Sequence, residues 1–193
     1  GGGAYCSGGI GVSVGLGGSQ TGVNYQLLIN GGGPTLPGTG GALTWTGQTI
    51  GGTYTVVATN VTTNCTQTMS SNALVTVNQL PAATFGVSGG GGCGPINVTL
   101  NGSQSGVDYQ LLLNGSNAPV SAVAGTGGPL SPSSWSGLTT GGTYTVRATN
   151  PTTTCWQLMG GSAIMNPLPA QYGVTGGGAY CSGGIGVSVG LGG

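Results

Sequence analysis

The sequence has almost no ionisable side chains. Among its 193 residues there is one acidic residue, Asp108, one basic residue, Arg147, and no histidine. A Ser/His/Asp triad, a catalytic carboxylate pair or a Cys/His pair needs residue types that are missing or present once. Metal sites need histidines or clustered carboxylates, and nucleic-acid binding needs a basic surface. The sequence therefore predicts no enzyme, no metal or cofactor site and no nucleic-acid partner.

Long hydrophobic runs are also lacking. No stretch is apolar for long enough to span a membrane, and none has the composition of a signal peptide. The 46 glycines would suit a disordered chain, but the hydrophobic residues, 37% of the total, fall in short regular runs, which predicts folding. Because the formal net charge is zero, copies of the chain repel one another little, which favours self-association. The absence of lysine excludes a Lys-Asn isopeptide bond.

One 18-residue stretch occurs twice without a difference. Residues 1–18 and 176–193 both read Gly-Gly-Gly-Ala-Tyr-Cys-Ser-Gly-Gly-Ile-Gly-Val-Ser-Val-Gly-Leu-Gly-Gly. Their separation predicts a repeating unit of about 175 residues, since a fixed period is typical of arrays. We expect such units to be joined head to tail.

Alternation of apolar and polar residues predicts an all-β protein, because no stretch has the three-and-four spacing of a helix. The expected strands of the first half are 12–16, 23–29, 35–37, 43–45, 54–59 and 73–77. Those of the second half are 96–100, 107–113, 130–135, 144–148 and 163–165. The proline in 35–37 predicts an edge strand.

The two halves are predicted to be homologous modules, residues 1–81 and 82–169. Matching tyrosines of the two halves are 84 residues apart for Tyr25 and Tyr109 and 90 residues apart for Tyr54 and Tyr144. The difference predicts six extra residues in the loop 117–125 of the second module. Residues 83–88 and 171–175 are expected to be the opening strands of the modules that follow them. By this assignment 170–193 begins a third module, and the first module takes its opening strand from residues before Gly1 or from another chain.

A resemblance supports this organisation. The stretch Gly-Thr-Tyr-Thr-Val-Val-Ala-Thr-Asn at 52–60, echoed at 142–150, is similar to the next-to-last strand of immunoglobulin-like domains, where a tyrosine anchors a corner. With Tyr-Cys-Ser-Gly-Gly, Asn-Tyr-Gln-Leu-Leu and Asn-Pro-Leu-Pro, the chain resembles the tandem immunoglobulin-like β-sandwich repeats of large secreted bacterial surface proteins and adhesins. The resemblance implies export, a head-to-tail array of modules and a role in adhesion or surface architecture. No cysteine lies within the tyrosine-bearing strand, so an antibody-like core disulfide is not expected.

The five cysteines are the sharpest chemical signal. Regular pairs in a glycine-rich exported chain predict disulfides; the cysteines are Cys6, Cys65, Cys93, Cys155 and Cys181. If four strands separate the two cysteines of a module, both lie at one end, and Cys6 joins Cys65 while Cys93 joins Cys155. If the edge strand at 35–37 is real, five strands separate them and they lie at opposite ends, too far apart to bridge. Cys6 then meets Cys155 across a module junction, and Cys93 meets the Cys65 of the next unit.

The sequence has two further features of a surface, glycosylation sequons and tryptophans. Five Asn-X-Ser/Thr sequons are candidate glycosylation sites, a weak signal in a chain so rich in these residues; they are Asn60, Asn64, Asn97, Asn101 and Asn114. Asn97 and Asn101 are expected on the outer face of their strand. Trp45 and Trp135 occupy matching places and are predicted to pack in a core or at a module interface, whereas Trp156 has Thr66 as its counterpart and is the better candidate for a ligand contact.

The predicted function is that of a structural subunit of an extracellular bacterial fibre or surface filament, whose partners are copies of itself and covalent glycans. The alternative is a ligand- or carbohydrate-binding adhesin module, which should carry a surface patch that its sister module lacks. The expected polymer junction comprises Gln171, Tyr172, Val174, Tyr180, Cys181, Ile185, Val187 and Val189. Either a continuous chain of units or a donor strand from a separate copy would complete the first module.

Overall fold

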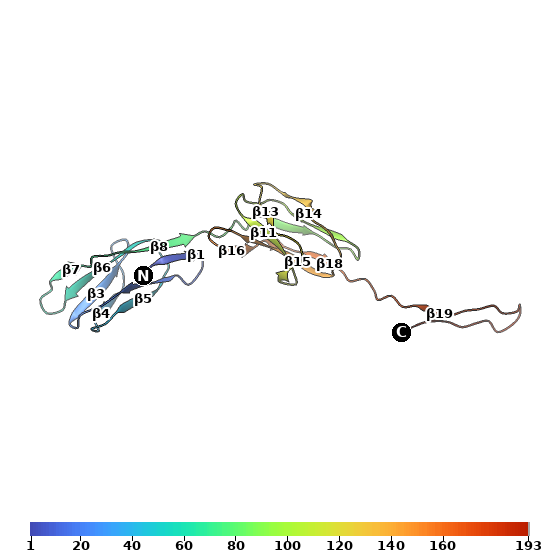
Figure 1. Cartoon of the computed structure of the whole chain (residues 1–193), viewed down its shortest axis with the longest axis horizontal. Coiled ribbons are helices and arrows are strands. Elements are labelled where there is room, and N and C mark those ends of the chain that lie inside the picture. The colour runs from blue at the N-terminus through green and yellow to red at the C-terminus, as the bar shows by residue number, and fades with distance from the viewer. Residues whose placement is uncertain (193) are drawn as a thin grey trace.

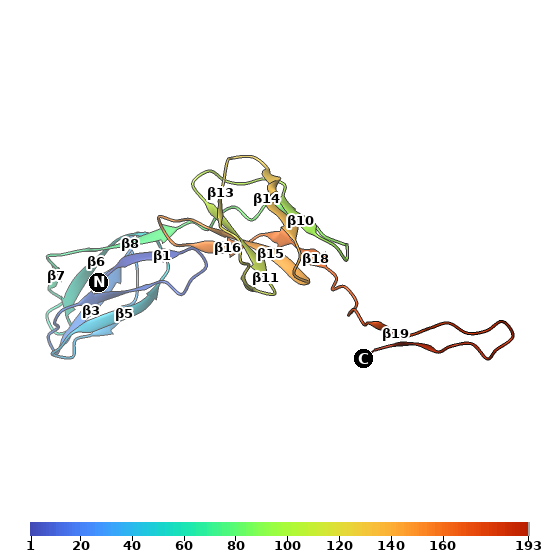
Figure 2. The same ribbon diagram turned by 45° about the vertical axis from the view of Figure 1, so that its right-hand side comes forward.

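The computed structural model describes residues 1–192, without the side chains of residues 131–133. Every regular element in that part of the chain is a β-strand. Two sandwiches lie end to end, and a strand pair extends beyond them (Figure 1). We call them module 1 (residues 1–81), module 2 (82–169) and the tail (170–193). In both views the tail runs away from module 2 (Figure 2).

Module 1 consists of two sheets. The larger has the order β1-β8-β6-β3-β4, with β7 also paired to β6, and the smaller contains β2 and β5. β1 runs parallel to β8, whereas the other pairs are antiparallel. The strands are β1 (Gly3–Cys6), β2 (Val12–Leu16), β3 (Val23–Leu28), β4 (Thr35–Pro37), β5 (Leu43–Gln48), β6 (Gly52–Asn60), β7 (Thr66–Thr68) and β8 (Ala73–Asn78).

Module 2 has a similar arrangement, with two more strands in the smaller sheet. Its larger sheet has the order β12-β11-β15-β16, with β13 on β11 and β18 on β15, and the other sheet has the order β14-β10-β9-β17. The strands are β9 (Gly86–Gly89), β10 (Ile96–Leu100), β11 (Asp108–Leu113), β12 (Ser116–Asn117), β13 (Val123–Ala124), β14 (Leu130–Leu138), β15 (Gly142–Thr149), β16 (Trp156–Leu158), β17 (Gly160–Gly161) and β18 (Ala163–Met165). The tail holds β19 (Val174–Gly176) and β20 (Val189–Leu191).

The apolar alternation read from the sequence makes the core of each sandwich. In β3, Val23, Tyr25 and Leu27 are buried while Asn24 and Gln26 are exposed, as a strand with one inward face requires. Trp45 and Trp135 are also buried in the cores of modules 1 and 2, which confirms that prediction.

Each module has the expected tyrosine corner. The Tyr54 hydroxyl donates to the carbonyl oxygen of Ile50 at 2.9 Å, and the Tyr144 hydroxyl donates to that of Thr140 at 2.7 Å. A tyrosine hydroxyl bonded to the backbone a few residues upstream is a hallmark of immunoglobulin-like sandwiches. With the two-sheet topology, it supports an immunoglobulin-like β-sandwich fold for both modules.

Two details of the sequence reading are wrong. The six extra residues of module 2 do not all lie at 117–125, because Leu36 and Val123 occupy matching places on β4 and β13, a shift of only 123 − 36 = 87. The other three lie between Leu130 and Trp135, where the β10–β14 register shifts, since an edge strand accommodates an insertion as a bulge. Residues 1–18 also supply β1 as well as β2, whereas the first strand expected from the sequence was 12–16.

Candidate assembly interface

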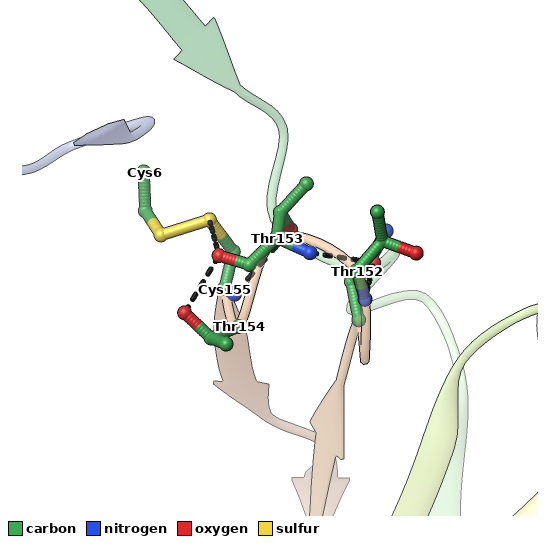
Figure 3. The surroundings of a disulfide bond; sticks show 6 residues. Cys6, Thr152, Thr153, Thr154 and Cys155 are labelled. Carbon is green, nitrogen blue, oxygen red and sulfur yellow. Dashed lines mark hydrogen bonds between the residues drawn. A yellow bond between two sulfur atoms is a disulfide. The ribbon is translucent and has the colours of Figure 1, made fainter. Parts of the chain in front are cut away.

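A disulfide joins the two modules. Cys6, the last residue of β1, is bonded to Cys155, which precedes β16, with their Cα atoms 5.6 Å apart (Figure 3). Cys155 is buried, and the turn that presents it is fixed by Asn150, whose side-chain oxygen accepts hydrogen bonds from the N–H groups of Thr152 at 2.9 Å and Thr153 at 3.2 Å. The bond connects the end of module 1 from which β8 leaves to the end of module 2 that faces it.

This bond decides between the two pairings that the sequence left open. The edge strand expected at 35–37 is present as β4, so five strands separate Cys6 from Cys65. Cys6 pairs with Asn78, beside the start of β6, whereas Cys65 follows the end of β6. The nine residues of β6 span about 25 Å at ~3.3 Å per residue, which no disulfide can bridge. Of the two alternatives, the structure has the Cys6–Cys155 bond across the junction, and the pairing of Cys6 with Cys65 is wrong.

The remaining cysteines, Cys65, Cys93 and Cys181, are exposed and unpaired within the described residues. Cys65 lies in a turn of the same kind as the turn of Cys155. The side-chain oxygen of Asn60 accepts hydrogen bonds from the N–H groups of Thr62 and Thr63, as that of Asn150 does in module 2. Cys93 corresponds to Cys6, at the end of module 2 from which the chain leaves. Each end of the two-module unit therefore carries one unpaired cysteine: Cys65, the counterpart of Cys155, at one end, and Cys93, the counterpart of Cys6, at the other.

Module 1 has two concave sites, one beside Gly1 and β2 and one at the end that bears Cys65. The first, of about 60 Å³, lies between the sheets; its lining includes Val14, Leu16, Tyr54, Val56, Met69 and Ala73. The second, of about 270 Å³, is lined by Gln20, Val23, Tyr25, Ala58, Asn60, Cys65, Gln67 and Met69. The modules differ here at two residues: Cys155 and Met159 of module 2 are buried, whereas their counterparts Cys65 and Met69 are exposed and half-buried.

One tyrosine at the covered end of module 2 has a perturbed pKa. Burial raises the pKa of the Tyr109 phenol, and the hydrogen bond that its oxygen accepts from the N–H of Gln104, at 2.8 Å, acts in the opposite direction. Tyr25 accepts the corresponding bond from Gln20 at 2.9 Å. The described residues hold no group of three or more histidines, cysteines or carboxylates that could bind a metal.

The predicted junction residues all lie on the tail and all are exposed. The tail strands β19 and β20 pair with each other and bring Val174 opposite Leu191 and Gly176 opposite Val189. Within residues 1–192 of the single chain, the predicted junction residues are not buried against either module. Within the described residues, no helix has the length and apolar character needed to cross a membrane.

The sequons are spread over the surface rather than gathered at one place. Asn64, Asn97, Asn101 and Asn114 are exposed, and Asn60 is half-buried. The outward position expected for Asn97 and Asn101 is the observed one. Trp156 is 56% exposed on β16, beside the equally exposed Leu158.

No family model matches the sequence, and no curated protein matches it significantly. Solved structures with a similar fold include fibronectin(III)-like modules of CbhA from Clostridium thermocellum, with 14% identity, a TM-score of 0.37 and coverage of 86% of this chain and 90% of that one. Another is the N-terminal eight immunoglobulin domains of Down Syndrome Cell Adhesion Molecule, with 16% identity, a TM-score of 0.44 and coverage of 84% and 26%. These similarities are distant and concern the fold alone.

Proposed function

We propose that this chain is a structural subunit of an extracellular fibre in which units of about 175 residues join head to tail, as repeat proteins stack their units. The observation that carries the proposal is the Cys6–Cys155 disulfide together with its two unpaired counterparts. Cys65 at one end of the unit corresponds to Cys155, and Cys93 at the other end corresponds to Cys6. Cys93 of one unit and Cys65 of the next then form the same bond that joins modules 1 and 2, so that every module junction is covalently fastened.

Two further features support an extracellular fibre. Disulfides persist in oxidising compartments, which favours export. With one acidic and one basic residue, the surface has almost no charge to keep copies apart, which favours association. Sugar on exposed sequons such as Asn97 would supply the hydration that charge does not.

The test is to oxidise the purified chain with oxidised glutathione and to map its disulfides. Two thiols, Cys65 of one copy and Cys93 of another, become one disulfide as glutathione disulfide is reduced to two thiols. Digestion with chymotrypsin suits this chain, because trypsin has a single site at Arg147. We expect a linked pair of peptides bearing Cys65 and Cys93, a ladder of multimers on a non-reducing gel and filaments in electron micrographs.

Matched variants make this test specific. Cys93→Ser should abolish the ladder, whereas Cys181→Ser should leave it intact, because Cys181 repeats Cys6 and the Cys155 that would receive it is already bonded. The proposal fails if the wild-type chain remains a monomer at high concentration with both thiols free. It also fails if Cys65 links to Cys181 as often as to Cys93.

A binding role is a second candidate, supported by one patch. Trp156 and Leu158 are exposed on β16, where β7 of module 1 carries Thr66 and Thr68 at the corresponding places. An adhesin module should show such a difference from its sister. A glycan or surface protein that binds the wild type and is lost in Trp156→Ala, but not in Thr66→Ala, would establish this role.

A further inference from the structure

The outer face of the larger sheet of module 2 carries both charged side chains of the protein. Asp108 on β11 and Arg147 on β15 are half-buried, and their neighbours along each strand are fully buried, so both charges lie on the face away from the core. Trp156 and Leu158 on β16 lie on the same face and are 56% and 49% exposed. We call these four residues the outer patch. The structure describes chain on both sides of module 2, and the outer patch is exposed with both sides present.

The strand register arranges the outer patch in two rows that cross the sheet. Each row takes one residue from β11, one from β15 and one from β16: Asp108, Thr149 and Trp156 in the first, and Gln110, Arg147 and Leu158 in the second. Residues directly opposite one another on neighbouring strands share a face, and the strands are about 4.8 Å apart. The acid and the base therefore lie in adjacent rows, and each row ends in an apolar side chain on β16.

Module 1 lacks the outer patch. At the matching places, which the register identifies, its sheet has Asn24, Val57, Thr66 and Thr68. The other two members of the rows are unchanged, since Gln26 and Thr59 of module 1 match Gln110 and Thr149. The two faces thus differ at the charged and large apolar places, and a unit of about 175 residues has one outer patch.

The two charges of the outer patch do not pair with each other within the described residues. The Nη2 of Arg147 donates to the side-chain oxygen of Asn117 at 3.3 Å, and its Nε is buried with no hydrogen-bond partner among those residues. Asn117 lies opposite Leu112, four residues along β11 from Asp108, so the guanidinium is directed away from the acid. A guanidinium offers five donors in a shape that fits a carboxylate. Since each copy has one acidic side chain, the carboxylate that fits Arg147 is Asp108 of another copy.

One arrangement of two copies makes their outer patches complementary. A twofold axis parallel to the rows places each strand over the same strand of the other copy and exchanges the acid row for the base row. The apolar pair on β16 then meets the same pair of the second copy, while Asp108 of each copy meets Arg147 of the other. An axis along the strands would instead bring β16 over β11 and place the apolar side chains against Asp108.

We propose that the outer patch of module 2 binds the outer patch of a second copy, with the strands of the two faces running in opposite directions and two Asp108–Arg147 ion pairs between the copies. This inference rests on the proposed fibre for its setting, in which the contact joins fibres side by side. Burial of Trp156 and Leu158 favours association, and the ion pairs set its orientation, since interfacial charges give specificity more than affinity. Repetition of a weak contact at every unit makes the lateral association of two fibres strong.

The test uses the full chain with Cys65, Cys93 and Cys181 replaced by serine, so that association is not covalent. Sedimentation velocity over a concentration series measures association. Asp108→Arg leaves two bases in each outer patch and Arg147→Asp leaves two acids, so each variant alone should associate about tenfold or more weakly.

Mixing the two charge variants gives the sharpest result. In an equimolar mixture every Arg of one chain meets an Asp of the other, so association should return to about the wild-type level. A variant that merely failed to fold could not be restored in this way.

Two further variants control for net charge and for the apolar part of the outer patch. Asn24→Arg places a base at the position of module 1 that matches Asp108, and association should be unchanged. Trp156→Thr installs the residue type of Thr66 and should weaken association about tenfold to a hundredfold, because a large apolar side chain is no longer buried. With its cysteines intact, Asp108→Arg should still form the Cys65–Cys93 ladder, but single filaments where those of the wild type lie in bundles.

The outcomes separate this inference from the fibre proposal. If the charge variants associate as the wild type does, if their mixture does not associate, or if the wild-type chain does not associate, the lateral contact is wrong; the fibre stands where the Cys65–Cys93 ladder still forms. If association follows the charges but neither ladder nor filaments form, the lateral contact stands and the fibre is wrong. If a glycan binds at Trp156 while the charge variants associate normally, the patch is a ligand site and the inference is overturned.

Discussion

Removal of the disulfide between the modules, by Cys6→Ser together with Cys155→Ser, tests how far the modules stabilise each other. While module 1 is folded, Cys6 is held beside Asn78. Unfolding of module 2 then leaves a closed loop that runs from Asn78 to Cys155. For a loop of about 77 residues the chain-entropy relation gives about 15 cal/mol/K, or about 4.5 kcal/mol at about 25 °C. Native strain and denatured-state structure reduce this figure, so we expect a loss of about 2–4 kcal/mol.

Urea-dependent hydrogen exchange with mass spectrometry measures this effect, because it reports each module separately. The free energy of opening of the buried strands β10, β11 and β15 should fall by that amount in the double variant. Cys93→Ser, which changes an exposed and unpaired thiol, is the control and should shift it by less than about 0.5 kcal/mol. If the double variant leaves module 2 as stable as before, the modules fold without help from the bond, and the reasoning about the closed loop is refuted.

Three other predictions concern single modules. Tyr54→Phe and Tyr144→Phe should each cost about 0.5–1.5 kcal/mol of unfolding free energy, measured by urea denaturation, because a backbone carbonyl loses its donor; no change in either would show that the corner is not a stabilising contact. Val87→Ala should destabilise module 2 by about 1–3 kcal/mol while module 1 is unchanged, since it removes the side chain that β9 buries. Because burial raises the pKa of Tyr109, its contribution to stability is complete below the unfolded value of about 10 and is lost as the pH rises above it. The fall in urea midpoint between pH 8 and pH 11 should therefore be smaller in Tyr109→Phe than in the wild type.

The strands of the sandwiches could be predicted from the sequence because their side chains alternate. Val23, Tyr25 and Leu27 indicate one buried face, and Pro37 indicates an edge. The repeated Gly-Thr-Tyr stretch pointed to the tyrosine corner, whose hydrogen bond is local in sequence. These features are set by short-range pattern, so one sequence is enough to recognise them.

Other features depend on contacts that leave no local pattern. β7, with the sequence Thr-Gln-Thr, is exposed at all three residues and forms only because β6 is long enough to pair with it. β1 contains glycine, tyrosine and cysteine and is held by its parallel pairing with β8. The sequence could not show that three extra residues precede Trp135. Leu130 has no neighbouring pattern that identifies it as the match of a particular leucine in module 1. The disulfide pairing needed the number of strands between two cysteines, which depended on the three-residue β4.

The bond between Cys6 and Cys155 also governs how the chain responds to a pulling force. Tension applied on either side of the two cysteines is carried by that bond, so the chain between Cys6 and Cys155, 149 residues apart in sequence, bears no load. At about 3.3–3.6 Å per extended residue, roughly 500 Å of extension is thereby withheld, even if both sandwiches come apart. Under load the molecule behaves as a short tether of nearly fixed length, and only the residues outside the bonded loop can stretch.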